Sequence, residues 1–186
     1  DIEGNPVEIA VNEDAATAAI VFKTVVDPFI GKLTFVKVVA GKLTADSPVI
    51  NMRTGEQERM IKMYYMCGKK QEETKCICAG DIGAIPKLQH TNTGDTLCSP
   101  TRKVVLEGVT YPEPVLSMAI LPKQKGEEDK VAQGVLRLLE EDPTLKFVNN
   151  AETHQMILSG LGEQHLDVVV SKLKGKFGLD VTLEKP

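Results

Sequence analysis

The residues of this chain that are best suited to chemistry lie in the segment Ser159–Leu166, which reads SGLGEQHL. Gly160 and Gly162 flank a single residue, and Glu163 and His165 follow almost directly. Carboxylates and imidazoles are common general acids and bases. Glycines just before a helix leave backbone N–H groups open to an anion. The segment therefore has two chemical interpretations: a small acid–base site, or a turn that binds an anion.

The elements around this segment predict a strand-to-helix corner. The apolar run Met156–Leu158 precedes it, and apolar residues recur on one helical face from Leu166 to Phe177. Residues two apart on a helix point about 200° away from each other, so Glu163 and His165 do not converge on one substrate. An acid in the first turn also suits the helix dipole without any catalysis. We therefore expect a structural corner that also forms a contact surface.

No phosphate-binding motif supports the anion interpretation. The chain contains neither G-x-x-x-x-G-K-[ST] nor G-x-G-x-x-G after a strand. An acylphosphatase-like enzyme requires an arginine in the anion-binding loop after the first strand of its fold. The corresponding loop here, Pro122–Gly126, contains no arginine, and its basic residues are two lysines. We therefore predict no catalytic residue and no cofactor site in this chain.

Composition restricts the class of protein. The chain has 186 residues, of which 42% are hydrophobic, enough for a packed core in one large or two small domains. Its net charge of −4 argues against binding nucleic acid by bulk electrostatics. Aromatic residues make up only 4%, too few for a platform that stacks single-stranded bases. No apolar run is long enough to span a membrane.

The four cysteines have no zinc-finger spacing. Cys67, Cys76, Cys78 and Cys98 follow the pattern C-x8-C-x-C-x19-C, which lacks paired C-x2-C knuckles. Cys76 and Cys78 are expected on the same face of a strand, because side chains alternate. We interpret them as reduced cysteines and predict no metal site. A metal or redox protein based on these cysteines remains the alternative from another functional class.

The first half of the chain predicts an antiparallel barrel. Its β-branched runs are short and are separated by Gly and Asp turns, which is typical of this all-β architecture. We expect strands over residues 19–26, 33–40, 49–52, 60–64, 75–78, 82–85 and 97–98.

The second half predicts a different fold, and Tyr111–Pro114 (YPEP) marks the boundary between domains 1–110 and 111–186. Its order is β-α-β-β-α-β, the ferredoxin-like α+β sandwich. We expect strands over 115–121, 145–148, 156–158 and 179–183, a turn over 149–152, one helix from Glu127 to Pro143 and a second that Gly178 ends.

Local basic residues are candidates for contact with structured RNA. Lys69 and Lys70 are expected on a loop, and Lys172 and Lys176 near the end of the second helix. Such side chains contact phosphates without reading sequence. Lysines at a helix end also suit the helix dipole, so a purely structural role is the alternative.

Several segments together resemble the elongation factor G family of translational GTPases, over essentially the whole chain. They are Phe22–Phe35, Arg53–Gly55, Ala79–Ile82, Thr93–Leu97, Tyr111–Pro114, Glu140–Pro143 and Ser159–Leu166. The family pattern around the last segment is typically SGMGELHL, so Leu161 and Gln164 depart from it. Gln164 puts a polar group where the family often has an apolar one.

The resemblance implies a non-catalytic fragment of a longer, cytoplasmic protein. The barrel would dock on the ribosome, on ribosomal RNA and a small-subunit protein. The second domain would lie against a GTPase domain that binds GTP with Mg, and would couple GTP hydrolysis to translocation. The alternative parent is a ribosome-protection protein of the tetracycline-resistance type. The expected contact residues are Gly160, Gly162, Glu163, Gln164, His165, Arg53, Lys69, Lys70, Lys172 and Lys176.

Overall fold

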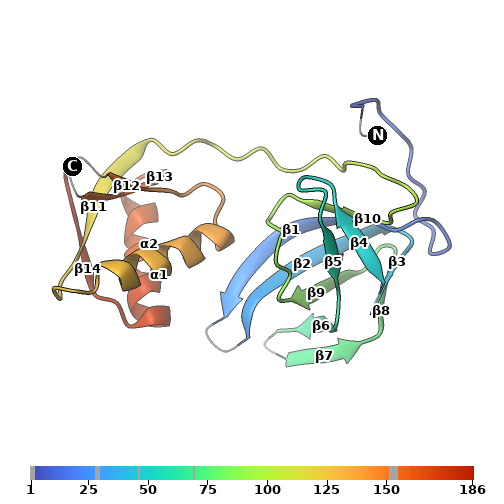
Figure 1. Cartoon of the computed structure of the whole chain (residues 1–186), viewed down its shortest axis with the longest axis horizontal. Helices are drawn as coiled ribbons and strands as arrows, with labels where there is room; N and C mark the ends of the chain where they lie inside the picture. Colours follow the sequence, from blue (N-terminus) through green and yellow to red (C-terminus); the bar gives the residue numbers. More distant parts are fainter. Residues whose placement is uncertain (1–2, 28–29, 46, 69, 151–154) are drawn as a thin grey trace. The chain divides into compact units, whose positions relative to one another are not determined.

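The computed structural model describes residues 3–186 except 28–29, 46, 69 and 151–154 (Figure 1). It divides into two compact units, Asp1–Val109 and Thr110–Pro186, and each is described by itself. The turn expected over 149–152 is wrong at Asn149 and Asn150, which belong to the strand Lys146–Asn150 because they pair with Met156 and Gln155. Its last two residues lie outside the described residues.

The first unit is all β, as predicted. Among its described residues, eight strands form one curled antiparallel sheet in the order β5-β4-β10-β1-β2-β9-β6-β7, and β3 pairs with β8 (Figure 1). The strands are β1 Ala18–Asp27, β2 Gly31–Ala40, β3 Lys42–Thr44, β4 Pro48–Asn51, β5 Gln57–Arg59, β6 Met63–Cys67, β7 Lys70–Thr74, β8 Cys76–Cys78, β9 Ile82–Pro86 and β10 Thr96–Cys98. The antiparallel barrel expected of a translation factor is confirmed.

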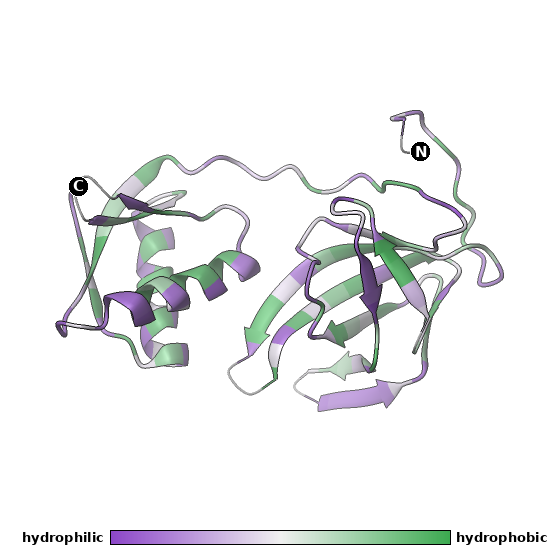
Figure 2. Ribbon diagram, viewed as in Figure 1, coloured by the Kyte–Doolittle hydropathy of each residue, from purple (hydrophilic) through white to green (hydrophobic). Residues whose placement is uncertain are grey.

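The interior of this unit is filled by alternate residues of its strands. Ile77 is fully buried, and Gly83 makes room for it: a Cβ at Gly83 would lie 2.1 Å from Ile77 Cδ1. Figure 2 shows that β5 and β7, the outer strands of the sheet, are hydrophilic, which discourages pairing with another chain. Because β5 and β7 have no alternation of apolar and polar residues, the sequence did not predict either strand. The strand expected over 60–64 corresponds only in part to β6, which starts later, at Met63. The prediction is wrong for residues 60–62, which lie between the end of β5 at Arg59 and the start of β6.

The second unit has the predicted β-α-β-β-α-β order. Its elements are β11 Leu116–Pro122, α1 Glu128–Glu141, β12 Lys146–Asn150, β13 Gln155–Gly160, α2 Glu163–Phe177 and β14 Val181–Glu184. The strands form an antiparallel sheet in the order β12-β13-β11-β14, and both helices cover one face of it (Figure 1). The ferredoxin-like fold is confirmed.

The helices of the second unit end for local reasons. Gly178 ends α2 in the left-handed conformation, with φ 69°, and its N–H donates to the carbonyl of Lys174. Asp142 caps the end of α1, and its N–H donates to the carbonyl of Leu138. Each helix buries one apolar stripe, including Val135 and Leu138 of α1 and Leu166 of α2. No helix of the described residues is long and apolar enough to cross a membrane.

Candidate functional site

The corner between β13 and α2 is built around two glycines with different tasks. Gly160 is buried at the end of β13, where an added Cβ would lie 2.8 Å from Leu166 Cδ2 and 3.0 Å from His165 Nδ1. Gly162 is the N-cap of α2 in extended backbone, with open space where a side chain would go. The corner therefore needs a glycine at 160 for space. The helix starts at Glu163, as expected.

His165 turns back from the first turn of α2 and is bonded at both ring nitrogens. The N–H of Leu161 donates to Nδ1 at 3.1 Å, and Nε2 lies 2.9 Å from Asp142 Oδ2. Since Nδ1 accepts, the proton of the neutral ring is on Nε2 and is donated to Asp142. Both nitrogens are therefore used in positioning the corner against the end of α1, and neither is available as a general base.

Asp142 joins three parts of the second unit through one carboxylate. Its Oδ1 accepts from the Thr144 N–H at 2.9 Å and from the Thr144 hydroxyl at 2.6 Å, while Oδ2 faces His165. Partial burial raises the pKa of Asp142, but the hydrogen bonds from Thr144 and His165 outweigh it and hold the pKa below its usual value. The carboxylate therefore stays charged, as a fixed acceptor.

Glu163 and Gln164 lie exposed beside this network. Gln164 faces solvent, so the polar residue at this position costs the packing of the helix nothing. Leu161 is also exposed, at 39%. The geometry separates the corner into a bonded inner layer and an exposed outer edge of Leu161, Glu163 and Gln164, which is suited to contact and not to acid–base chemistry.

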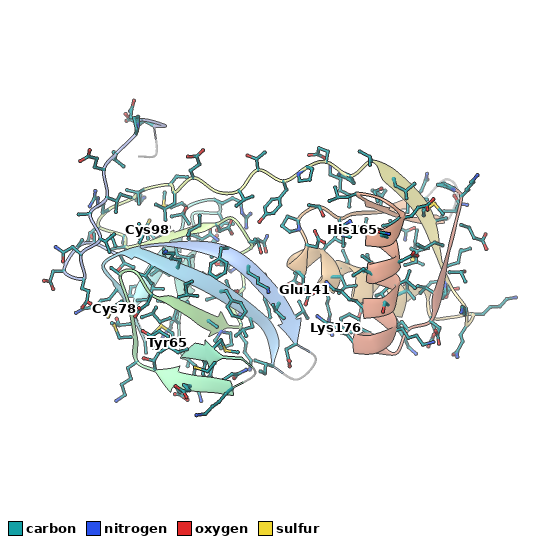
Figure 3. All side chains as sticks on the ribbon, turned by 180° about the vertical axis from the view of Figure 1, so that it is seen from behind. Tyr65, Cys78, Cys98, Glu141, His165 and Lys176 are labelled. Atoms are coloured by element: carbon teal, nitrogen blue, oxygen red, sulfur yellow. The ribbon has the colours of Figure 1, made fainter. Side chains whose placement is uncertain are left out.

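Lys172 and Lys176 of α2 both pair with Glu141 of α1, and Figure 3 labels Lys176 and Glu141 on the two helices. Lys176 Nζ lies 2.5 Å from Glu141 Oε1, and Lys172 Nζ lies 3.5 Å from Oε2. The Glu141 side chain is only 8% exposed. A buried carboxylate needs such partners, so both lysines have a structural role in joining α1 to α2.

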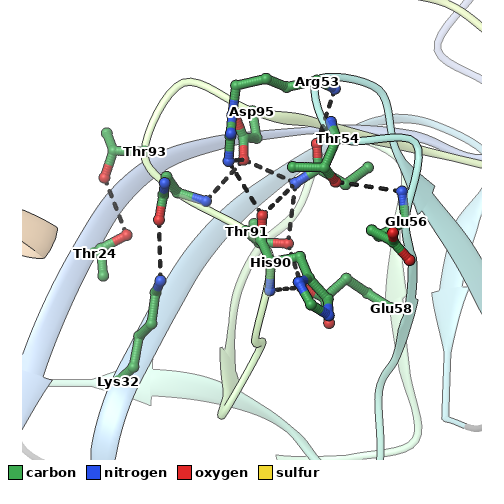
Figure 4. A network of polar contacts seen from close by, with 12 residues as sticks. Thr24, Lys32, Arg53, Thr54, Glu56, Glu58, His90, Thr91, Thr93 and Asp95 are labelled. Carbon is green, nitrogen blue, oxygen red and sulfur yellow. Dashed lines mark hydrogen bonds and ion pairs between the residues drawn. The ribbon is translucent and has the colours of Figure 1, made fainter.

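Arg53 belongs to a polar network that holds the β4–β5 turn to the loop before β10 (Figure 4). Its Nε donates to Asp95 Oδ1 at 2.6 Å and its Nη2 to Oδ2 at 2.9 Å. Asn51 donates to the same carboxylate, at 2.8 Å. The hydrogen bond with Asp95 raises the pKa of Arg53. Burial raises the pKa of Asp95, but the bonds from Arg53, Asn92 and Asn51 bring it below its usual value.

A second buried carboxylate, Glu58 of β5, fixes the same loop. It accepts from the backbone N–H of His90 at 2.7 Å and from the Thr91 hydroxyl at 2.8 Å. Arg53 and Glu58 thus give the loop its shape. About half of the Arg53 side chain, 51%, is still exposed for contact with a partner.

The sequence predicted Lys70 on a loop, and this prediction is wrong. Lys70 is the first residue of β7, and its Nζ pairs with Glu72 Oε1 at 2.8 Å. The strand continues to this position because Lys70 lies opposite Cys67 in the β6–β7 ladder. Lys69 lies outside the described residues.

The first unit also has a basic cavity that no sequence pattern indicated. A cavity of about 410 Å³ is lined by Ile30, Arg59, Ile61, Lys62, Tyr64, Pro86 and Lys87. Three of the lining side chains, Arg59, Lys62 and Lys87, are basic and exposed, and Lys62 also pairs with the exposed Glu73 at 3.5 Å. Lys87 has φ 61°, in the left-handed region that favours glycine. Only the pairing of β6 with β9 brings residues 59–64 beside residues 86–87, so no local pattern could have predicted the cavity.

Comparisons with known proteins cover both units. Residues 16–100 match the family model described as elongation factor G domain 2, and residues 111–185 match that described as elongation factor G, domain III. Among solved structures, the chain is similar to the crystal structure of a Thermus thermophilus protein, with a TM-score of 0.81 and 28% identity. The match covers 93% of this chain and 26% of that protein, so the chain spans about a quarter of its length.

Proposed function

Because this chain belongs to the elongation factor G family, we propose that it is the non-catalytic central part of a ribosome-dependent GTPase. GTP and Mg would bind to another domain of the parent protein, in the cytoplasm. The two domains of this chain would transmit the nucleotide state to the ribosome and couple hydrolysis to translocation.

The observation that carries this proposal is the succession of the two matched domains, barrel first and ferredoxin-like unit second, in one chain. The chemistry of the corner agrees with it. Both ring nitrogens of His165 are bonded within the fold, and Glu163 lies exposed beside them. An arrangement of this kind supports a shaped contact surface and not a reaction.

For the barrel, the basic cavity supports docking on ribosomal RNA. Phosphate oxygens would pair with Arg59, Lys62 and Lys87, while a base or a ribose would pack on Ile61 and Tyr64. The left-handed backbone of Lys87 costs about 1–2 kcal/mol in a non-glycine residue. Strain of this kind is common where a side chain is held for function.

For the second unit, the exposed edge of the corner supports a protein or RNA contact. Leu161, Glu163 and Gln164 stand outside a corner whose inner layer is fixed by His165 and Asp142. We propose that this edge meets the GTPase domain of the parent or the ribosome.

A binding experiment with purified small ribosomal subunits tests the barrel proposal. The double variant Lys62→Gln, Lys87→Gln should bind more weakly than the unmodified chain. The slope of log K against log salt should fall by roughly 0.7–0.9 for each lost phosphate contact. The matched control is Lys23→Gln, Lys103→Gln, which removes two exposed lysines of the same unit outside the cavity.

Equal weakening by the cavity variant and the control would refute the cavity as the docking site. Absence of any binding to the subunit would refute ribosome docking by this chain. In calorimetry, we expect no binding of GTP to the chain, and clear binding would overturn its assignment as a non-catalytic part.

A further inference from the structure

Two thiols lie side by side on the outer surface of the barrel. Cys76 and Cys78 occupy β8 on either side of Ile77, which is fully buried. Both cysteines therefore lie on one face of the strand, as their spacing predicts. That face points away from the core, and both cysteines are partly exposed. Their Sγ atoms are 3.7 Å apart. Pairing with β3 fixes the backbone that carries the two thiols. In this ladder Cys78 lies opposite Lys42, and Cys76 lies opposite Thr44.

The separation of the two sulfurs matches a chelate. For a metal–sulfur bond of about 2.3 Å, a 3.7 Å separation corresponds to an S–metal–S angle of about 107°, close to tetrahedral. A disulfide would need the sulfurs to approach to about 2.05 Å with a Cα–Cα distance below about 6.8 Å. Consecutive same-face residues of an extended strand are about 6.6 Å apart, at the upper end of that range, so a disulfide would still have to close the sulfurs from 3.7 Å to about 2.05 Å. Metal binding requires little or no movement of the strand.

The surroundings also suit a cation. The hydrogen bond between the two thiols, burial and the nearby Glu13 carboxylate raise the pKa of Cys78 to about 11. At neutral pH Cys78 is therefore a poor nucleophile, because the thiolate is the reactive form. The negative charge of Glu13, which disfavours a thiolate beside it, would favour a metal cation at the same place.

We propose that Cys76 and Cys78 form a two-thiolate chelate for a thiophilic divalent cation of the zinc and cadmium type. Binding forms two metal–sulfur bonds, breaks two S–H bonds and releases both protons to the solvent. Among the described residues, no group of three or more His, Cys, Asp or Glu side chains is placed to hold a metal. Water completes the coordination, so we expect an exchangeable site and not a structural one.

Cadmium titration of the reduced chain, with a phosphine reductant that does not compete as a thiol, tests the proposal. We expect one Cd²⁺ per chain and the ultraviolet charge-transfer band of cadmium–thiolate bonds. Cys76→Ser and Cys78→Ser should each lower the affinity by at least about 100-fold, because even the loss of an outer-shell partner costs roughly 10–100-fold. Cys67→Ser is the matched control, since Cys67 is exposed and lies at the end of a different strand.

Alkylation of the unmodified chain provides a test that needs no variant. Zn²⁺ should slow the alkylation of Cys76 and Cys78, read by mass spectrometry, and leave the rate at Cys67 unchanged. Equal affinity of the wild-type chain and the Cys78→Ser variant would overturn the proposal. So would an equal loss in Cys67→Ser, or protection of Cys67 to the same degree. None of these outcomes bears on ribosome binding, so the two proposals fail independently.

Discussion

Gly160→Ala should destabilise the second unit, whereas Gly162→Ala should be nearly neutral. The two glycines stand two residues apart in the same corner, so the pair is a matched comparison. An added Cβ at Gly160 would lie 2.8 Å from Leu166 Cδ2, 3.0 Å from His165 Nδ1 and 3.4 Å from Leu145 Cδ2. At Gly162 nothing lies within 4 Å.

The size of the effect follows from these distances. Carbon atoms in contact prefer separations of about 3.5–4.0 Å, so Leu166 would have to move by at least about 0.7 Å. Leu166 is fully buried, and His165 is held at both ring nitrogens. Overpacking of this kind costs about 1–3 kcal/mol, of which the reduced entropy of the unfolded chain recovers about 0.4–1 kcal/mol. We expect a net loss of about 1–2 kcal/mol in the free energy of unfolding.

The Gly162→Ala variant lacks the steric cost. Its backbone is extended, with φ 164° and ψ 178°, which any residue adopts. Alanine is a poorer N-cap than glycine, which lowers the free energy of unfolding. The smaller conformational entropy of the unfolded chain raises it by a similar amount. The expected change in the free energy of unfolding is within about 0.5 kcal/mol of zero.

Thermal unfolding followed by the helical circular dichroism signal reports on the second unit, because α1 and α2 both lie there. For a unit of this size about 4–8 °C of melting temperature corresponds to 1 kcal/mol, so Gly160→Ala should melt roughly 4–16 °C lower. Equal melting of the two variants would refute the packing argument. A larger loss in Gly162→Ala would show that the N-cap, and not the space at Gly160, limits the corner.

Four further substitutions, one of them a control, test charged side chains within each unit. Asp142→Asn should make the free energy of unfolding depend less on pH in the acid range. Because the pKa of Asp142 is lowered in the folded state, its stabilisation is present above the usual pKa near 4 and is lost as pH falls through the folded pKa. Urea unfolding at several pH values would record the difference. Glu141→Gln should cost about 1–3 kcal/mol in the same assay at neutral pH, while Glu113→Gln, which removes an exposed partner of Lys146, should cost less than about 1 kcal/mol. Arg53→Lys should destabilise the first unit by about 1–2 kcal/mol, because an ammonium cannot make both bonds to Asp95, and amide exchange in the loop before β10 would measure it.

The fold was largely predictable from local patterns. Alternating β-branched runs indicate the strands of the first unit, and apolar residues at helical spacing indicate α1 and α2 within one or two residues of their ends. The strands β5 and β7 were missed because an outer strand with charged residues on both faces has no apolar alternation. Such strands form because the neighbouring strand supplies their hydrogen bonds, which no local pattern records.

The site was predictable only in part. The corner itself and its helix start at Glu163 were accessible from the order of residues, whereas the solvent exposure of Gln164 came from the structure. The bonds of His165 to Asp142, 23 positions earlier, were also not accessible from the order of residues. The same holds for the basic residues around the cavity, which come from two segments that meet only when β6 pairs with β9.

By itself, the sequence determined both helices, most of the strands, and that a barrel is followed by a ferredoxin-like unit. These properties depend on periodicity and on backbone preferences, which act over a few residues. Only the tertiary structure decided that His165 is a bonded positioning group and that Lys172 and Lys176 serve Glu141. It also placed two sulfurs 3.7 Å apart on the outside of the barrel. Those outcomes depend on which elements pack together, because the charge and the availability of a side chain are set by its neighbours in space.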